Sequence, residues 1–269
     1  MSALRAIPTM MRIGFAEAVA YRAEMFVWVL STTMPFVNLT LWSSIAAVSP
    51  VAGANKTWDS PRFVAYFLSV FIVRQLMASW ACWEINWEVR SGTLAMRLLR
   101  PIHPYVSFLM QNLAALPMRF AVTLPVVAIL VLGSSAQFLT RDPAMWGVWV
   151  LTLIGAWAIT FFANVAIGAL SLFMDSSIKI MDVWLVAFFV FSGYSFPLDV
   201  VGLKPLVAAS EWLPFRLQIG LPVDVMTNVI DLPTALHLLA LQWAWAGAFV
   251  VVSLLLWRAG VKRFQAFGG

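Results

Sequence analysis

Residues 84–104 read EINWEVRSGTLAMRLLRPIHP, which is the most concentrated run of charge in an otherwise apolar sequence. The segments on either side, about residues 63–85 and 113–135, are each long enough to cross a bilayer. A helix needs roughly 20 apolar residues to span about 30 Å of hydrocarbon. The charged stretch is therefore predicted to be a polar loop between two membrane spans.

The composition of the whole chain agrees with this interpretation. Of the 269 residues, 62% are hydrophobic and 11% are charged, and the mean hydropathy is +0.89. A soluble domain has about half apolar and a quarter charged residues, and its core cannot hide this much apolar surface. Because the strand-like alternation of an outer-membrane barrel is absent, we predict an all-α integral membrane protein.

Six apolar segments are predicted to cross the membrane as helices of a single transmembrane domain over residues 1–269. Their approximate bounds are 25–48, 63–85, 113–135, 145–174, 178–196 and 236–257. Within them, polar side chains are predicted to bond between helices and not to bind ligands. These residues are Asn38, Asn164 and Gln242.

Two further segments are predicted to lie at the membrane surfaces. Residues 1–24 carry apolar side chains at spacings of three and four, including Met11, Phe15 and Val19, which predicts an interfacial amphipathic helix. A plain solvated leader is the alternative. Residues 197–235 are interrupted by prolines and glycines, and we interpret them as two short helices that enter the membrane from one side.

The distribution of positive charge orients the spans. Six spans place both termini on one side, and ten of the 17 Lys and Arg residues then lie on that side. Five lie on the other side, and Arg74 and Arg119 fall within spans. The positive-inside rule therefore places both termini and residues 86–112 in the cytoplasm.

Motifs for catalysis and nucleotide binding are missing from the sequence. None of the four lysines follows a glycine, so the P-loop pattern GxxxxGK[ST] is absent, as are HExxH, GxSxG and GxGxxG. Cys82 lies in an apolar run and is interpreted as a buried thiol, and neither His103 nor His237 has metal-ligand spacing. We expect no enzyme activity, no metal site and, without a basic aromatic stripe, no nucleic-acid binding.

The charged stretch also carries a family resemblance. Residues 88–105, EVRSGTLAMRLLRPIHPY, are similar to the pattern after the second span of ABC-2 type permeases, the membrane subunits of bacterial ABC exporters. In that pattern a glycine precedes a leucine, a basic residue and LRP or a close variant. SFPLDV (195–200), EWLPFR (211–216) and WRAGVKRFQAFGG (257–269) also resemble the six-span permeases of about this length.

The resemblance implies partners and cofactors that the chain itself lacks. In such permeases the loop after span two is a coupling helix that lies in a groove of a separate ATPase subunit. Two such subunits carry ATP and Mg, and a second permease copy or a related permease completes the path. We therefore expect an exporter of an amphipathic or lipid-like substrate, dimeric and lipid-embedded in a bacterial inner (cytoplasmic) membrane.

Within the loop, residues 93–99 predict a short docking helix that has an apolar face beside basic residues. Gly92 permits the bend before this helix, and Pro101 ends it. An interfacial helix held by anionic headgroups is the alternative. The expected coupling residues are Glu84, Glu88, Arg90, Gly92, Leu94, Arg97, Leu98, Leu99, Arg100 and Pro101. The two glutamates are predicted to clamp the loop, to pair with the ATPase or to form a solvated face.

The two arginines within spans allow two interpretations, because a guanidinium there is costly and usually faces the bundle interior or a cavity. In the first, Arg74 and Arg119 line the translocation path and contact an anionic substrate head. In the second, Arg119 reaches toward the surface from a nearby span end, and Arg74 pairs with a carboxylate such as Asp182.

The broken segment 197–235 resembles the re-entrant helices on the outer face of these permeases, where it would close the exit of the path. The residues expected in this outer gate are Pro197, Pro214, Phe215 and Pro222. A structural plug is the alternative.

Two other functions compete with export. An ion-coupled secondary transporter or channel calls for carboxylates in mid-span, whereas Glu84 and Asp182 lie nearer the predicted span ends. The two halves of the chain also show no inverted repeat. A membrane scaffold without transport fits the composition but leaves the two arginines within spans unexplained.

Overall fold

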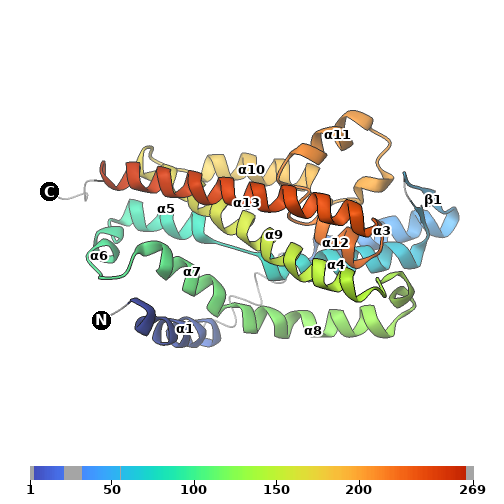
Figure 1. The fold of residues 1–269 in the computed structure, drawn as a ribbon, viewed down its shortest axis with the longest axis horizontal. Coiled ribbons are helices and arrows are strands. Elements are labelled where there is room, and N and C mark those ends of the chain that lie inside the picture. The colour runs from blue at the N-terminus through green and yellow to red at the C-terminus, as the bar shows by residue number, and fades with distance from the viewer. Residues whose placement is uncertain (1–2, 21–31, 55, 265–269) are drawn as a thin grey trace.

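The computed structural model describes residues 3–20, 32–54 and 56–264, and Figure 1 shows them as an elongated bundle of helices with one small hairpin. The first half contains α1 (Ala3–Ala20), α3 (Met34–Val48), β1 (Val51–Ala52), β2 (Thr57–Trp58), α4 (Ser60–Met77), α5 (Ala81–Ser91), α6 (Leu94–Leu98), α7 (Pro104–Ala114) and α8 (Leu116–Leu132). The second half contains η1 (Ser134–Phe138), α9 (Pro143–Ala169), η2 (Leu170–Leu172), α10 (Ile178–Phe191), η3 (Leu198–Val200), α11 (Lys204–Trp212), α12 (Gly220–Met226) and α13 (Leu232–Val261). The two strands pair antiparallel, with Val51 opposite Trp58.

Four helical segments of the described chain are long and apolar enough to cross a membrane. They are Ser60–Ser91, Pro104–Leu132, Pro143–Leu172 and Leu232–Val261, and they overlap the second, third, fourth and sixth predicted spans. The shorter helices α3 and α10 overlap the first and fifth, although residues 25–31 of the first lie outside the described part. The all-α membrane architecture is thus confirmed, and the number of six spans stays a prediction.

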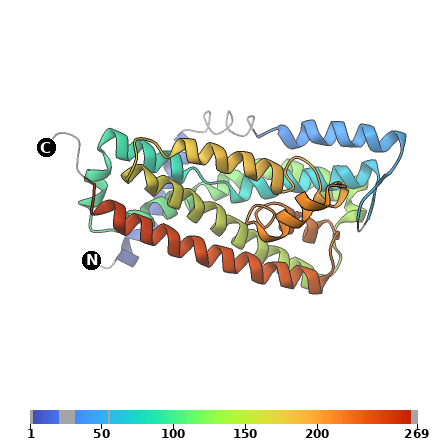
Figure 2. The ribbon, with the colours of Figure 1, turned by 90° about the horizontal axis from the view of Figure 1, so that it is seen from above.

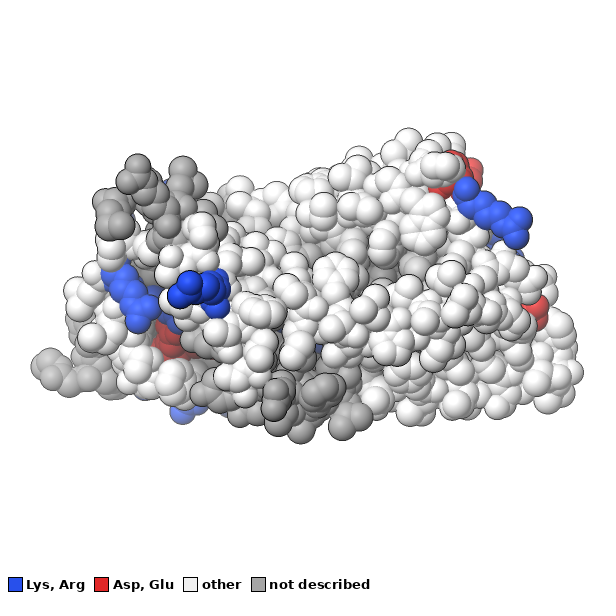
Figure 3. Space-filling model, turned by 90° about the horizontal axis from the view of Figure 1, so that it is seen from below, with Lys and Arg blue, Asp and Glu red and all other residues white. Residues whose placement is uncertain are grey.

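The surface of the molecule carries the polarity expected of a membrane protein. On the face in Figure 3, charged side chains gather toward the two ends, and a broad uncharged band separates them. Large apolar side chains are exposed on α8 and α13, including Leu124, Ile129, Val251 and Leu255. Exposed apolar surface of this kind is stable against lipid or another subunit, not against water.

Helix α9 forms the centre of the bundle and packs against α4, α5, α12 and α13. The carboxyl-terminal half of α9 is almost entirely buried. Figure 2 shows α13 along one side of the molecule and α3 along the other. Gly155 of α9 faces Gln242 of α13, where an added Cβ would lie 2.5 Å from Gln242 Oε1. This close approach lets the amide of Gln242 reach across to α9.

The predicted interhelical hydrogen bond is confirmed for Gln242, whereas Asn38 of α3 bonds to a residue in the loop after α10. Gln242 Nε2 donates to the carbonyl oxygens of Thr152, at 2.9 Å, and Leu217, at 2.6 Å. Asn38 Nδ2 donates to the carbonyl of Tyr194 at 3.5 Å. The prediction is wrong for Asn164, whose Nδ2 bonds to the carbonyl of Thr160 in its own helix.

The loop predicted over residues 86–112 is longer than the one observed. Helix α5 continues to Ser91 and α7 begins at Pro104, so only residues 92–103 lie between them, with α6 inside. Both helices extend beyond the apolar spans because one face of each is apolar. Val89, Tyr105 and Phe108 from these faces are buried together in one cluster with Trp257 of α13.

The second predicted span is not one continuous helix. Helix α4 ends at Met77 and α5 begins at Ala81, and Ala78 has φ −59° and ψ 140°, outside the helical region. Residues 78–80 therefore interrupt the segment Ser60–Ser91 near its middle. Irregular backbone at membrane depth is tolerated only where protein or a cavity satisfies its polar groups.

The two surface segments agree in part with their predictions. Helix α1 is present and packs against α7, where a Cβ on Gly14 would lie 2.8 Å from Ala114 Cβ. Segment 197–235 does contain two short helices, but only α12 lies inside the bundle, with all seven residues buried. Helix α11 buries only Ser210 because charged residues such as Lys204 and Glu211 keep it outside.

Candidate functional site

The coupling segment is a helical hairpin whose turn depends on Gly92. This residue ends α5 with φ 73°, a left-handed conformation that is strained for residues with a side chain. Helix α6 follows at Leu94–Leu98, with Thr93 and Leu99 as its flanking caps. The short helix predicted at residues 93–99 is therefore present at this position.

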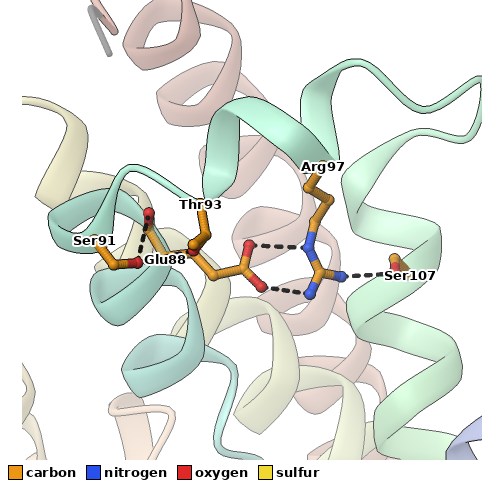
Figure 4. Close-up of polar contacts among 5 residues, drawn as sticks. All are labelled: Glu88, Ser91, Thr93, Arg97 and Ser107. Atoms are coloured by element: carbon orange, nitrogen blue, oxygen red, sulfur yellow. Dashed lines mark hydrogen bonds and ion pairs between the residues drawn. The ribbon is translucent and has the colours of Figure 1, made fainter. Parts of the chain in front are cut away.

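An ion pair fixes α6 between α5 and α7. Arg97 Nε donates to Glu88 Oε2 at 2.9 Å, and Arg97 Nη2 donates to the other oxygen of the same carboxylate. Arg97 Nη1 donates to Ser107 Oγ of α7 at 2.6 Å, as Figure 4 shows. The guanidinium also stacks 4.3 Å from the ring centroid of Phe108. The two charged side chains are only 14% and 12% exposed.

This geometry decides between the interpretations of Glu88. A bidentate, mostly buried arginine–carboxylate pair is a strong contact, whereas solvent-exposed pairs contribute about 0.2–1 kcal/mol. Glu88 and Arg97 hold three helices together and are not available to a partner. We call this arrangement of Glu88, Arg97 and Ser107 the clamp.

The apolar side chains of the segment point in two directions. Leu94 is completely buried, and Leu98 packs against the same cluster as Tyr105. Met96 is 66% exposed and Leu99 80% exposed. The exposed side chains that remain for a partner are Arg90, Met96, Leu99, Arg100 and Pro101, which we call the outward face of the segment.

The structure contains a groove next to the outward face that was not predicted from the sequence. It encloses about 630 Å³ and is lined by Arg90, by Phe173 and Asp175 after η2, and by Arg263 at the end of α13. The guanidinium of Arg263 lies 5.5 Å from the ring centroid of Phe173. The polar turn at residues 175–177 was the available signal, but the sequence did not show that it adjoins the coupling segment.

His103 begins α7 as its amino-terminal cap. Its Nδ1 accepts a hydrogen bond from the backbone N–H of Tyr105 at 3.2 Å. Partial burial and then the positive charge of Arg258 lower the pKa of His103. The neutral form is the one that can accept this bond, so the cap is intact when the imidazole is deprotonated.

Arg119 lies deeper than predicted. Because the third segment starts at Pro104, Arg119 is near the middle of Pro104–Leu132 and not close to a span end. The interpretation that it reaches the membrane surface is therefore wrong. Its Nη1 donates to the carbonyl of Ala78, to which Asn112 Nδ2 also donates at 3.4 Å. Arg119 thus satisfies a carbonyl that the break between α4 and α5 leaves free.

Arg74 lies one turn before the same break, and its proposed partner is wrong. Within the described residues no carboxylate lies within 4.0 Å of Arg74, and Asp182 is exposed. The guanidinium carbon of Arg74 instead lies 5.7 Å from the ring centroid of Phe188. Arg74 lines a small, partly open cavity together with side chains of α5, α9 and α10.

The structure places all four predicted gate residues in the interior of the outer segment. Pro197, Pro214, Phe215 and Pro222 are all buried. The ring of Phe215 packs on Trp184 of α10, with 4.6 Å between centroids.

An ionic contact beside these residues was missed in the sequence. Arg216 lies 3.8 Å from Glu211 of α11 and 3.7 Å from Asp224 of α12. An open cavity of about 980 Å³ adjoins Arg216 at this end of the molecule. The predicted outer gate is therefore a packed layer that borders an open chamber.

Comparison with known proteins adds a family to this geometry. The sequence model of ABC-2 family transporter proteins matches residues 32–268, which include every described helix except α1. A comparison with curated proteins gives no match. The matched range contains the coupling segment, the broken second span and the outer segment. The chain therefore belongs to the ABC-2 family of transporter proteins and is a multi-pass transmembrane subunit of an ABC transporter, whose partners include ABC ATPases.

Proposed function

We propose that this subunit exports an amphipathic or lipid-like substrate and that two separate ATPase subunits drive it through the coupling segment. ATP and Mg bind to those subunits, and this chain carries no catalytic site of its own. The observation that supports the proposal best is the clamp, because Arg97 joins α6 to α5 and α7. These two helices lead into the second and third spans.

Through the clamp, a displacement of α6 would be transmitted to the second and third spans together. The outward face, with Met96 and Leu99, would dock into a groove of the ATPase, while Leu94 fixes the inner side of α6. The break at residues 78–80 then allows α5 to tilt relative to α4. Closure of the ATPase subunits would in this way change the surroundings of Arg74 and Arg119 inside the bundle.

The proposed assembly is a dimer of permeases in a bacterial inner membrane, with both termini in the cytoplasm. Its second subunit is another copy of this chain or a related permease. The end that carries α6 also carries exposed Arg258, Lys262 and Arg263, as the positive-inside rule requires of a cytoplasmic face. The outer segment, at the opposite end, would close the exit of the path.

Copurification tests this proposal. The chain is expressed with the ABC ATPases of its own organism, and one of them is expected to elute together with it from a detergent extract. Leu99→Asp places a charge on the outward face and is expected to abolish co-elution, whereas Lys204→Asp on exposed α11 at the far end preserves it. Failure of the unaltered chain to bind the ATPase would overturn the proposal.

A further inference from the structure

The small, partly open cavity beside the break in the second span has the polar chemistry of a binding site. It encloses about 30 Å³ and lies between α4, α5, α9 and α10. A water molecule needs about 10–15 Å³ in such a measure, so the cavity as it stands has room for water but not for a larger group. We call it the Arg74 cavity.

Two side chains of the Arg74 cavity hold polar atoms that have no hydrogen-bond partner. Asn164 is 2% exposed and Gln218 is 1% exposed. The Nδ2 of Asn164 donates to the Thr160 carbonyl, and the Oε1 of Gln218 accepts from Thr160 Oγ1 at 3.0 Å. Asn164 Oδ1 and Gln218 Nε2 are buried and unpaired. A buried polar atom without a partner has lost its hydrogen bonds to water, so such atoms call for a ligand or water.

Positive charge is concentrated at this cavity. Arg74 lines it, and Arg119 is close enough for the two guanidinium groups to repel each other. The charge of Glu84 attracts Arg119, but within the described residues no carboxylate lies within 4.0 Å of Arg74. Two cations near one another at membrane depth are stabilised when an anion joins them.

The wall of the cavity is apolar and includes the helix that could open it. Trp83 of α5 lines the cavity together with Met181, Trp184 and Phe188 of α10. Of the 14 residues of α10, only Met181 and Phe188 are buried, so this helix is held mainly by its cavity-facing side. A displacement of α10 would enlarge the cavity without breaking the contacts of α9 with α13.

We propose that the Arg74 cavity, once a displacement of α10 has enlarged it, binds the anionic head of an amphiphilic substrate. Arg74 and Gln218 Nε2 donate to a phosphate or carboxylate oxygen, Asn164 Oδ1 accepts from a hydroxyl or amine of the same head, and the aromatic wall contacts the start of the apolar tail. This site deepens the export function proposed above by naming the substrate class, and it rests on that function for its role in transport.

A binding experiment without the ATPase separates this site from the export function. The full-length chain in nanodiscs of neutral phosphatidylcholine is titrated with dodecyl phosphate. Dodecyltrimethylammonium supplies the same tail with the opposite charge, and inorganic phosphate supplies the head without the tail. We expect dodecyl phosphate to bind at least about tenfold more tightly than either, because charged hydrogen bonds supply the difference.

Variants test whether dodecyl phosphate binds in the Arg74 cavity. Arg74→Gln is expected to weaken dodecyl phosphate binding at least about tenfold, and Arg141→Gln, at an exposed site beyond the spans, leaves it unchanged. Gln218→Glu keeps the guanidinium but adds a competing carboxylate, so it is expected to abolish binding. Elution as a single folded species is checked for each variant, and Gln218→Glu tests the site if Arg74→Gln does not fold.

Three results would overturn the proposal. The first is equal binding of dodecyl phosphate by Arg74→Gln and the unaltered chain. The second is equal binding of the two amphiphiles, which would mean recognition of the tail alone. The third is equally strong binding of inorganic phosphate, which would mean a small-anion site. Because no ATPase is present, each of these results leaves the docking of the ATPase untouched.

Discussion

Replacing Arg97 with methionine should uncouple ATP hydrolysis from movement of the membrane spans. Methionine keeps an unbranched apolar stem and removes the bonds to Glu88 and Ser107. The Glu88 carboxylate, 12% exposed, then loses its charged partner. Removing one partner of a buried pair costs about 3–5 kcal/mol.

Because both side chains keep some exposure to solvent, we expect Arg97→Met to lose about 3 kcal/mol of stabilising free energy, the lower end of that range. A change of this size shifts an equilibrium roughly a hundredfold. This lost free energy destabilises the position of α6 but not the spans, because Leu94 and the cluster around Trp257 stay packed. Helix α6 would therefore loosen on a folded scaffold.

The assay compares hydrolysis with movement in the reconstituted complex. Cys82 is buried, so a cysteine introduced at exposed Ala208 of α11 can carry a fluorescent probe at the outer end. The unaltered protein is expected to show an ATP-dependent change of this signal. Arg97→Met should keep ATP hydrolysis and lose the signal, whereas Arg258→Gln, at an exposed arginine of the same end, should keep both.

A charge swap makes the test specific to the clamp. Glu88→Arg combined with Arg97→Glu restores an ion pair in the reverse orientation and should recover part of the ATP-dependent signal. An Arg97→Met protein that responds to ATP as strongly as the unaltered protein would refute the idea that the clamp transmits the movement.

Three further predictions concern residues around the clamp and the break. Gly92→Ala places a side chain at φ 73° and should destabilise the coupling hairpin by about 1–2 kcal/mol, seen as faster proteolysis between α5 and α6. Arg119→Leu removes a donor to the Ala78 carbonyl and should lower the midpoint of thermal unfolding, while Arg119→Lys restores part of it. His103 has a lowered pKa, so its cap to Tyr105 is present above the ordinary histidine pKa and is lost as the pH falls through the lowered value. His103→Ala should accordingly cost up to about 1 kcal/mol of folding free energy at pH 8, and this cost should shrink as the pH falls through the lowered pKa, measured by thermal unfolding.

The charged loop and most helices could be predicted because their signals are local. Gly92 and Pro101 bound a short stretch in which α6 forms, and long apolar runs give the main spans. The ends of α5 and α7 could not be predicted by counting apolar residues. These helices extend on amphipathic faces whose partner, Trp257, lies far away in the sequence.

The interior was predicted less well because its contacts are tertiary. Residues 78–80 contain neither proline nor glycine, so no local signal marks the break. Its freed carbonyl is stable because Arg119 reaches it from another helix. The depth of Arg119 depends on where α7 begins, and the absence of a carboxylate at Arg74 among the described residues depends on how α10 places Asp182. Neither property is encoded near the arginines themselves.

Site-specific photo-crosslinking from position 96 tests the central claim most directly. A photoreactive residue replaces Met96 on the outward face, and a second protein carries it at Val37, an exposed position of α3. In native membranes that contain the ATPase, position 96 is predicted to crosslink to the ATPase and position 37 is not. Crosslinking of position 96 to lipid alone would contradict the account, because it would identify α6 as an interfacial helix and not a docking helix.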